Sequence, residues 1–356
     1  MRYRRPVLVA AIATLAILAV VVAAVAGATT SRPSATTLTI SNWDAYTPKD
    51  LIPKFEKATG IKVKLVKHTT NEDIMGKLEA QNGGGYDIVF VSGPFAESLK
   101  KRGWAARLDH AQIPNLKNLY PAAFKLAYDP GNKYSVPYTW GTTGLCWRSD
   151  LTKTPTSWND LLKPSADLKG KVTMLATDRW LLLPALKTLG YSLNTVNPAQ
   201  LQKAAAVLKE TKKSLLAYDD TTFYSKLVSG EAKLVQAWDG WCNYGIAENP
   251  KIKFIIPKEG SDVFVDTMVV LAKSKNQEAA HKFLDWVLRA DSGKAVTELV
   301  LYKTPNAKAM AQVKKSLAKQ YPNLAIPPKL LLTFQTERDL GKAQPLWSRT
   351  VSEILG

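Results

Sequence analysis

Two Trp-Asp pairs carry the most suggestive chemistry in the sequence. Trp43-Asp44 and Trp238-Asp239 each follow a short run of apolar and β-forming residues, which is typical of a strand. The face of a tryptophan attracts a cation, at about 0.5–2 kcal/mol per contact, and a carboxylate makes a charge-assisted hydrogen bond with an ammonium group. Together these residue types predict an amine site. The alternative is that both tryptophans are core residues and both aspartates cap helices, and spacing alone does not separate the two interpretations.

The segments around the first pair alternate between strand and helix patterns. We expect strands at 38–40, 61–66 and 86–91, and helices at 48–58, 70–81 and 94–101. The strand at 86–91 is apolar on both faces, as a buried parallel strand is. This alternation is typical of an open, doubly wound α/β lobe.

A second α/β series begins beyond Trp140-Gly141. We expect strands at 172–175, 234–237 and 264–272, and helices at 180–189, 198–211, 221–229 and 277–289. Ligands of open α/β sheets collect outside the carboxyl ends of the strands. That rule selects Trp43, Ser92 and Trp238, each of which lies at or just past the end of a predicted strand.

The N-terminal segment predicts export. A basic start followed by an apolar run without charged residues indicates that residues 1–28 are a signal peptide or an N-terminal anchor. Small residues at Ala24, Ala26 and Ala28 favour cleavage, but the run has about the 20 residues of a membrane span, so an anchor stays open. Residues 29–36 form a polar linker. We therefore expect the protein in the periplasmic space or on the outer face of the cytoplasmic membrane, where Cys146 and Cys242 form either one disulfide or two buried thiols.

The charge and the histidines exclude several classes of function. The formal charge of +18 falls to +14 without the four arginines of the signal region and linker, and the lysines occur singly on amphipathic segments, which argues against a nucleic-acid partner. The three histidines, His68, His110 and His281, have no metal-ligand or nucleophile–base spacing. The sequence thus argues against an enzyme and predicts no metal or cofactor.

Seven sequence fragments carry a resemblance to a known family. They are 42–46 (NWDAY), 58–63 (ATGIKV), 86–89 (YDIV), 136–141 (VPYTWG), 189–192 (LGYS), 257–260 (PKEG) and 304–306 (TPN). In this order they resemble the spermidine/putrescine-binding proteins of ABC importers. The resemblance implies a type II periplasmic-binding-protein fold with two α/β lobes and a ligand cleft between them. Lobe 1 would comprise 37–142 and 265–311, and lobe 2 would comprise 143–264 and 312–356.

The same resemblance implies a set of ligand-binding residues. The aromatic box would consist of Trp43, Tyr46, Trp238, Phe264 and Tyr302. Ser92 and Gln335 would make polar contacts, and Asp266 would be the carboxylate that pairs with an amine. Asp44 stands at a position that adjoins the ligand in the family. The implied partners are a small polyamine-like ligand and an ABC permease in the membrane, with the receptor itself a monomer.

The chain also departs from the family. Thr177 and Trp180 stand where spermidine receptors carry a pair of acids, so one anchoring charge is missing or moved. Asp44, Asp178 or Asp239 could restore it. Trp180, like Trp241, lines the cleft or belongs to the core. The alternative function is therefore the same receptor fold with a different small solute, one that is not a polyamine and could be an anion.

Overall fold

A computed structural model of the protein describes residues 36–313 and 315–356. The predicted export signal at 1–28 and all of the linker except Thr36 lie outside the described residues. Among the residues that are described, we find no helix with the length and apolar character that a bilayer span requires.

The first lobe is built on a mixed six-stranded sheet. Its strands run in the order β11-β10-β3-β1-β2, and β4 pairs with β10. β1, β2 and β3 are parallel to one another, whereas β10 is antiparallel to β3 and β4. The bounds are β1 Thr37–Trp43, β2 Lys62–His68, β3 Ile88–Ser92, β4 Val136–Gly141, β10 Asp262–Val270 and β11 Gln335–Thr336. The helices of this part of the chain are α2 Leu51–Thr59, α3 Asn71–Ala80, α4 Gly93–Lys101, α10 Gln277–Val287, α11 Ala290–Val300, α12 Ala307–Met310 and α14 Pro328–Leu331.

The ends of the first helix show where local sequence signals succeed and fail. As predicted, α2 ends before Gly60, which has a left-handed φ of 73° that glycine adopts without a steric cost. The predicted start near Pro48 is wrong, because α2 begins at Leu51. The Thr47 hydroxyl accepts a hydrogen bond from the side chain of Asn42 at 2.9 Å and so closes the turn after β1 instead of capping the helix.

The second lobe is built on a five-stranded sheet in the order β7-β6-β8-β5-β9. β6, β7 and β8 are parallel, and β5 is antiparallel to both of its neighbours. The bounds are β5 Thr143–Arg148, β6 Val172–Met174, β7 Ala217–Tyr218, β8 Leu234–Trp238 and β9 Ile252–Ile255. The associated helices are α5 Asn159–Leu162, α6 Asp178–Thr188, α7 Pro198–Lys212, α8 Phe223–Ser229, α9 Asp239–Glu248, α13 Lys315–Gln320 and α15 Gln344–Leu355.

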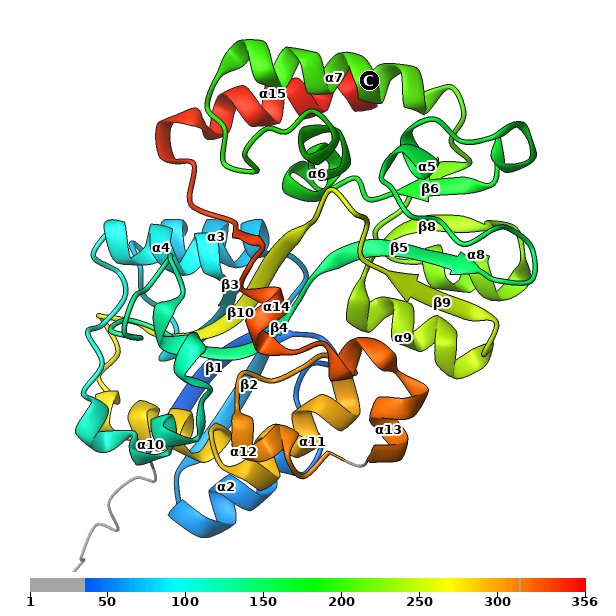
Figure 1. The fold of residues 1–356 in the computed structure, drawn as a ribbon. Helices are drawn as coiled ribbons and strands as arrows, with labels where there is room; N and C mark the ends of the chain where they lie inside the picture. Colours follow the sequence, from blue (N-terminus) through cyan, green and yellow to red (C-terminus); the bar gives the residue numbers. More distant parts are fainter. Residues whose placement is uncertain (1–35, 314) are drawn as a thin grey trace, which may run out of the picture. The chain divides into compact units, whose positions relative to one another are not determined.

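Several segments of the chain cross between the two lobes (Figure 1). β4 passes into β5 with only Thr142 between them, β9 leads back to β10, and the segment after β11 leads to α15, which packs beside α7. β10 joins the first sheet from Asp262 onward, where it pairs with β11. The two-lobed α/β fold is confirmed, and the sequence boundaries of the lobes given above remain a proposal.

A disulfide fastens the core of the second lobe. Cys146 of β5 and Cys242 of α9 are both fully buried, and their Cα atoms are 6.0 Å apart. Of the two possibilities that the sequence left open, the structure has the disulfide. It ties α9 to the sheet, and α9 begins directly after Trp238, so the link also supports the junction of β8 and α9 at which the second Trp-Asp pair lies.

Candidate ligand-binding site

The register of β10 places Asp266 between two hydroxyl side chains. Asp266 lies opposite Ser92 of β3 on one side and opposite Thr139 of β4 on the other. The Ser92 hydroxyl donates to Asp266 Oδ1 at 2.8 Å, and the Thr139 hydroxyl donates to Oδ2 at 3.3 Å. Directly paired residues on neighbouring strands have adjacent side chains, which is why three residues far apart in sequence meet here.

A third hydroxyl completes the surroundings of Asp266. Tyr46, in the loop after β1, donates to Asp266 Oδ2 at 2.8 Å, and its own carbonyl accepts a hydrogen bond from Tyr138 at 2.6 Å. No lysine, arginine or histidine of the described chain forms an ion pair with Asp266.

Burial raises the pKa of the Asp266 carboxyl, against the hydrogen bonds from Tyr46, Ser92 and Thr139, which favour the ionised form. Three neutral donors orient the carboxylate without cancelling its charge. The geometry is therefore suited to receiving a cation.

Aromatic rings extend from this carboxylate in a continuous series. Trp43 contacts Tyr46 with ring centroids 5.5 Å apart, Tyr46 contacts Tyr302 at 6.4 Å, and Tyr302 contacts Phe264 at 5.7 Å. These are edge-to-face contacts, the arrangement that aromatic quadrupoles favour. These four rings belong to the aromatic box expected from the sequence.

The series continues into the second lobe through a residue whose role the sequence left open. Trp180 of α6 contacts Phe264 at 6.4 Å and Trp238 at 5.1 Å. Its indole Nε1 donates to Asp262 Oδ2 at 3.0 Å, which fixes the ring against the start of β10. Trp43 and Trp238 thus have no direct ring contact among those described, and four rings connect them. Trp241 packs farther out, 6.5 Å from Trp238, at the edge of the second-lobe core.

Glycines allow two of these rings to approach the backbone. A Cβ atom at Gly240, at the start of α9, would overlap the ring of Tyr302, and one at Gly141 would overlap the ring of Phe264. Both positions lie where the lobes meet, so the missing side chains let the aromatic series pass from one lobe to the other.

Two predicted residues have other partners. Asp44 is exposed and forms an ion pair with Lys67 at 2.5 Å. Gln335 accepts from the backbone N–H of Leu193 at 2.9 Å through its Oε1, and its Nε2 donates to Ser192 at 3.2 Å. No described contact joins Asp44 or Gln335 to Asp266 or to the aromatic rings.

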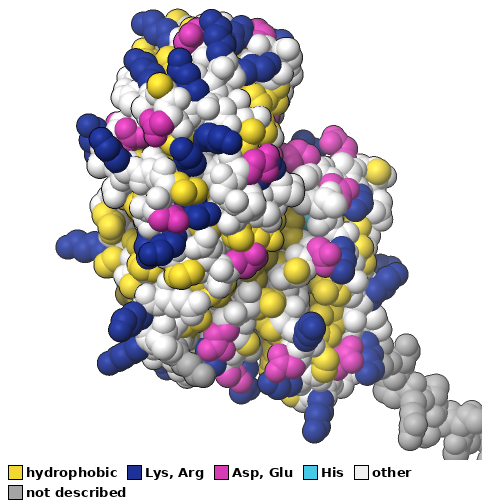
Figure 2. All heavy atoms as spheres, turned by 90° about the vertical axis from the view of Figure 1, so that its right-hand side faces the viewer, with side chains coloured by type: hydrophobic (Ala, Val, Ile, Leu, Met, Phe, Trp, Pro, Cys, Tyr) yellow, Lys and Arg dark blue, Asp and Glu magenta, His cyan; other side chains and the backbone are white. Residues whose placement is uncertain are grey.

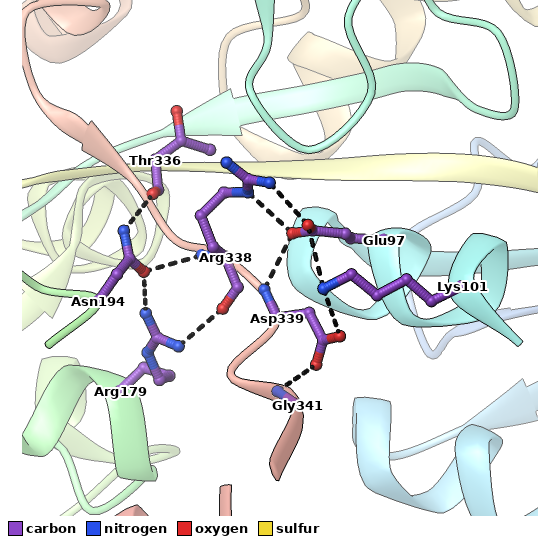
Figure 3. A network of polar contacts seen from close by, with 8 residues as sticks. All are labelled: Glu97, Lys101, Arg179, Asn194, Thr336, Arg338, Asp339 and Gly341. Atoms are coloured by element: carbon purple, nitrogen blue, oxygen red, sulfur yellow. Dashed lines mark hydrogen bonds and ion pairs between the residues drawn. The ribbon is translucent and has the colours of Figure 1, made fainter. Parts of the chain in front are cut away.

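The segment that follows Gln335 is held by both lobes (Figure 3). The Arg338 guanidinium donates to both carboxylate oxygens of Glu97 in α4, at 2.8 and 2.7 Å. Lys101, which lies in α4 with Glu97, forms ion pairs with both Glu97 and Asp339. From the second lobe, Asn194 Oδ1 accepts from the Arg338 backbone N–H at 2.9 Å. The segment after Gln335 is therefore attached to both lobes by hydrogen bonds and ion pairs.

The other two acids considered as a second amine partner also have partners elsewhere. Asp239 is fully buried and forms an ion pair with Lys303 at 2.6 Å. Asp178 accepts hydrogen bonds from Gln344 at 3.3 Å and Ser348 at 3.1 Å, so it faces α15. Neither carboxylate is arranged to receive a cation from the aromatic side.

Two small pockets of the described chain are lined by residues other than these rings. One is lined by residues that include Tyr138, Val287 and Val296, and the other by residues that include Asp50 and Trp286. Neither contains a residue of the aromatic series or an acid considered above. No group of three or more metal-ligating side chains occurs among residues 36–313 and 315–356.

The basic residues do not form one patch on the face of the molecule shown in Figure 2. On the face shown in Figure 2, Lys and Arg side chains are spread over the surface, with acidic side chains between many of them. This matches the single lysines of the sequence, which we interpreted as solvated faces.

Comparison with known proteins identifies the family. The model of the bacterial extracellular solute-binding protein family matches residues 50–326, which is most of the chain. The chain belongs to this family. As a solute-binding protein it acts in transport outside the cytoplasm, takes a small-molecule ligand, and is not an enzyme.

Relatives of this solute-binding protein include periplasmic proteins named for the polyamines that they bind. The chain is 32% identical to the spermidine/putrescine-binding periplasmic protein of Salmonella typhimurium, over 89% of this chain and 91% of the relative. It is 31% identical to the putrescine-binding periplasmic protein PotF of Escherichia coli, over 83% and 85%. Among solved structures, a putative spermidine/putrescine ABC transporter protein from Listeria monocytogenes superposes with a TM-score of 0.82 at 32% identity, over 90% of this chain and 99% of that one.

Sequence reasoning missed parts of the candidate site and its surroundings. Thr139 received no role, although it lies in a fragment that carried the resemblance, because a strand buried along its whole length has no alternating pattern to mark its inward face. Lys303 was also missed. A lone lysine between Tyr302 and Thr304 in an otherwise uncharged stretch is a signal that could have indicated a buried partner.

Proposed function

We propose that this solute-binding protein captures a polyamine, such as putrescine or spermidine, or a related amine, for an ABC importer. The observation that carries the proposal is the Asp266 carboxylate, which is oriented by Tyr46, Ser92 and Thr139 and has no cationic partner in the described chain. An ammonium group would supply the missing positive charge.

The aromatic rings suit the same ligand. An alkylammonium loses its hydration in a buried site, and this loss is offset by a carboxylate and by ring faces. An anionic solute would instead face the Asp266 charge, so the geometry favours the amine over that alternative. The names of the relatives, which are spermidine- and putrescine-binding proteins, support the same ligand class.

The proposed site draws on both lobes. We assign to it the nine residues expected from the sequence, of which seven are joined by the contacts described above and two, Asp44 and Gln335, are not. A ligand that contacts residues of both lobes binds the closed arrangement better than the open one and shifts the population toward it. The closed, monomeric receptor would then dock on the membrane permease.

Calorimetry tests this function. The mature protein is titrated with putrescine, spermidine, n-butylamine and succinate. We expect Kd values of about 1 μM or lower for a polyamine, which corresponds to about −8 kcal/mol, and no binding of succinate. The absence of heat with both polyamines would overturn the proposal.

Two variants locate the site. Asp266→Asn keeps the shape of the side chain but removes its charge, and we expect polyamine affinity to fall by at least about tenfold. Asp167→Asn changes an exposed carboxylate of the second lobe that bonds Ser165, and it is expected to leave affinity unchanged. Equal affinities of both variants would show that Asp266 does not contact the ligand.

A further inference from the structure

The carboxyl ends of three parallel strands meet at one edge of the second sheet. β7, β6 and β8 are adjacent in that order and parallel. Trp238 ends β8, Thr177 follows β6, and Asp220 follows β7. Loops at this edge of an α/β sheet are where ligands collect, so Asp220 is placed on the ligand side of the lobe.

Asp220 has surroundings of the same kind as Asp266. Its Oδ1 accepts from the backbone N–H of Ala176 at 2.8 Å, and its Oδ2 accepts from the Thr177 hydroxyl at 3.0 Å. The residue is half-buried, and in the described chain it forms no ion pair. A carboxylate can accept about four hydrogen bonds, so two neutral donors leave it oriented, charged and able to take more.

The neighbouring acids are neutralised from within the protein. Asp219 forms an ion pair with Lys226 at 2.5 Å and caps the turn that precedes α8. Asp239 is paired with Lys303. A second ammonium group would gain little from carboxylates that already have a cation at contact distance.

Two buried acids near the segment after Gln335 are enclosed by the protein. Asp262 and Glu337 form no ion pair in the described chain, and both Asp262 oxygens accept hydrogen bonds from protein groups. With Asp178 turned toward α15, Asp220 is the remaining acid at this edge of the sheet without a cationic partner.

The aromatic series leads toward Asp220. Trp180 lies in the first turn of the helix that Thr177 precedes, and Phe223 begins the helix that follows Asp220. Both rings contact Trp238, at 5.1 and 6.4 Å. The rings thus run from the Asp266 carboxylate in the first lobe to the strand ends that carry Asp220.

We propose that Asp220, oriented by Thr177, binds the second ammonium group of a polyamine whose first ammonium group pairs with Asp266. The inference rests on the proposed function and sharpens it. A monoamine satisfies only one of the two carboxylates, so the receptor is selective for diamines and longer polyamines.

The test compares ligands with one and several ammonium groups. Calorimetry with spermidine, putrescine and n-butylamine is performed on the wild type and on Asp220→Asn. We expect the variant to lose at least about tenfold in affinity for its best polyamine, and less than about threefold for n-butylamine. An unchanged polyamine affinity in Asp220→Asn overturns the inference but leaves the proposed function intact, whereas a wild type that binds no polyamine overturns both.

A second variant covers the case in which Asp220→Asn does not fold. Thr177→Val removes the hydroxyl that orients the carboxylate but keeps the charge, so Thr177 acts as a positioning residue. We expect a smaller loss of polyamine affinity, about threefold to tenfold, and none for n-butylamine. Equal losses for both ligand types would instead mean general damage to the site and would count against the inference. Asp167→Asn is again the control for removal of a second-lobe carboxylate.

Discussion

Lys303 Nζ lies 2.6 Å from Asp239 Oδ2, and both side chains are almost completely buried where the two lobes meet. Lys303 also donates to the carbonyl of Asn323 at 2.9 Å. Its backbone pairs with Trp140 of the first lobe, whereas Asp239 begins α9 of the second. The pair is therefore an internal ionic contact between the lobes.

Removing one partner of this pair should be costly. Lys303→Met leaves the Asp239 charge buried and unpaired, and we expect a loss of about 3–5 kcal/mol in the free energy of unfolding in urea. The double variant Lys303→Met, Asp239→Asn should recover most of that loss. The exposed pair Lys213–Glu210 provides the control, because Lys213→Met should cost less than about 1 kcal/mol. Similar losses for the two lysine variants would contradict the role of the buried pair.

Ligand affinity should depend on pH through Asp266. An ammonium group binds the ionised carboxylate, so a proton competes with it. Because burial raises the pKa of Asp266 above the usual 3.8, the competition begins at a higher pH than for an exposed aspartate. Affinity should be constant above the raised pKa and fall by up to about tenfold per pH unit below it. Calorimetry between pH 8 and 4 measures how the affinity for a polyamine depends on pH. A wild-type affinity that does not change over this range would contradict the prediction. The affinity of the control variant Asp266→Asn should not change with pH.

Glu337 should make the unliganded protein less stable at high pH. The residue is 4% exposed and has no hydrogen bond or ion pair among the described contacts. Burial raises its pKa from 4.5 to about 8, with Arg179 opposing the shift. Between these values the folded state holds a proton that the unfolded state releases, so the stabilisation present below pH 4.5 is lost as pH rises to about 8. The loss is about 1.4 kcal/mol per unit of pKa difference.

The variant Glu337→Gln removes this titration. In chemical unfolding at pH 5, 7 and 9, its stability should vary less than that of the wild type, and the difference between the two should be largest at pH 9. Glu231→Gln, at an exposed position, serves as the control and should follow the wild type. Parallel curves for Glu337→Gln and the wild type would refute the expectation.

The disulfide should contribute to stability chiefly by restricting the unfolded chain. It closes a loop across a sequence separation of 96 residues between two fully buried cysteines. The double variant Cys146→Ala, Cys242→Ala should lose about 2–5 kcal/mol. A reductant should lower the Tm of the wild type and leave that of the double variant unchanged. An identical Tm for wild type and double variant without reductant would contradict this prediction.

The local elements could be predicted because their signals are local. The predicted strand at 234–237 corresponds to β8, and the helix predicted at 70–81 corresponds to α3, where the Thr70 hydroxyl accepts from the Asp73 N–H at 3.1 Å. The strands β4, β5, β7, β9 and β11 were missed. Each pairs with segments distant in the chain, and strand formation depends on such partners more than on the strand's own residues.

The first carboxylate of the proposed site could be predicted from the sequence, and the second proposed carboxylate could not. Asp266 was found from residues that resemble a known family, and its register confirms that it meets Ser92. Which acid of the second lobe keeps its charge depends on internal cations. Lys303 neutralises Asp239 across a separation of 64 residues, and no local pattern reports that contact.

The two Trp-Asp pairs show which features the sequence predicts and which depend on the tertiary structure. The sequence by itself determined that they lie at the ends of strands in a two-lobed α/β fold, because apolar periodicity and turn residues act over a few positions. Only the tertiary structure decided what the pairs do. Trp43 and Trp238 are the ends of one aromatic series that passes through Trp180. Asp44 and Asp239 instead form ion pairs with Lys67 and Lys303. Contacts of this kind depend on strand register and lobe packing, which bring together residues that the chain keeps far apart.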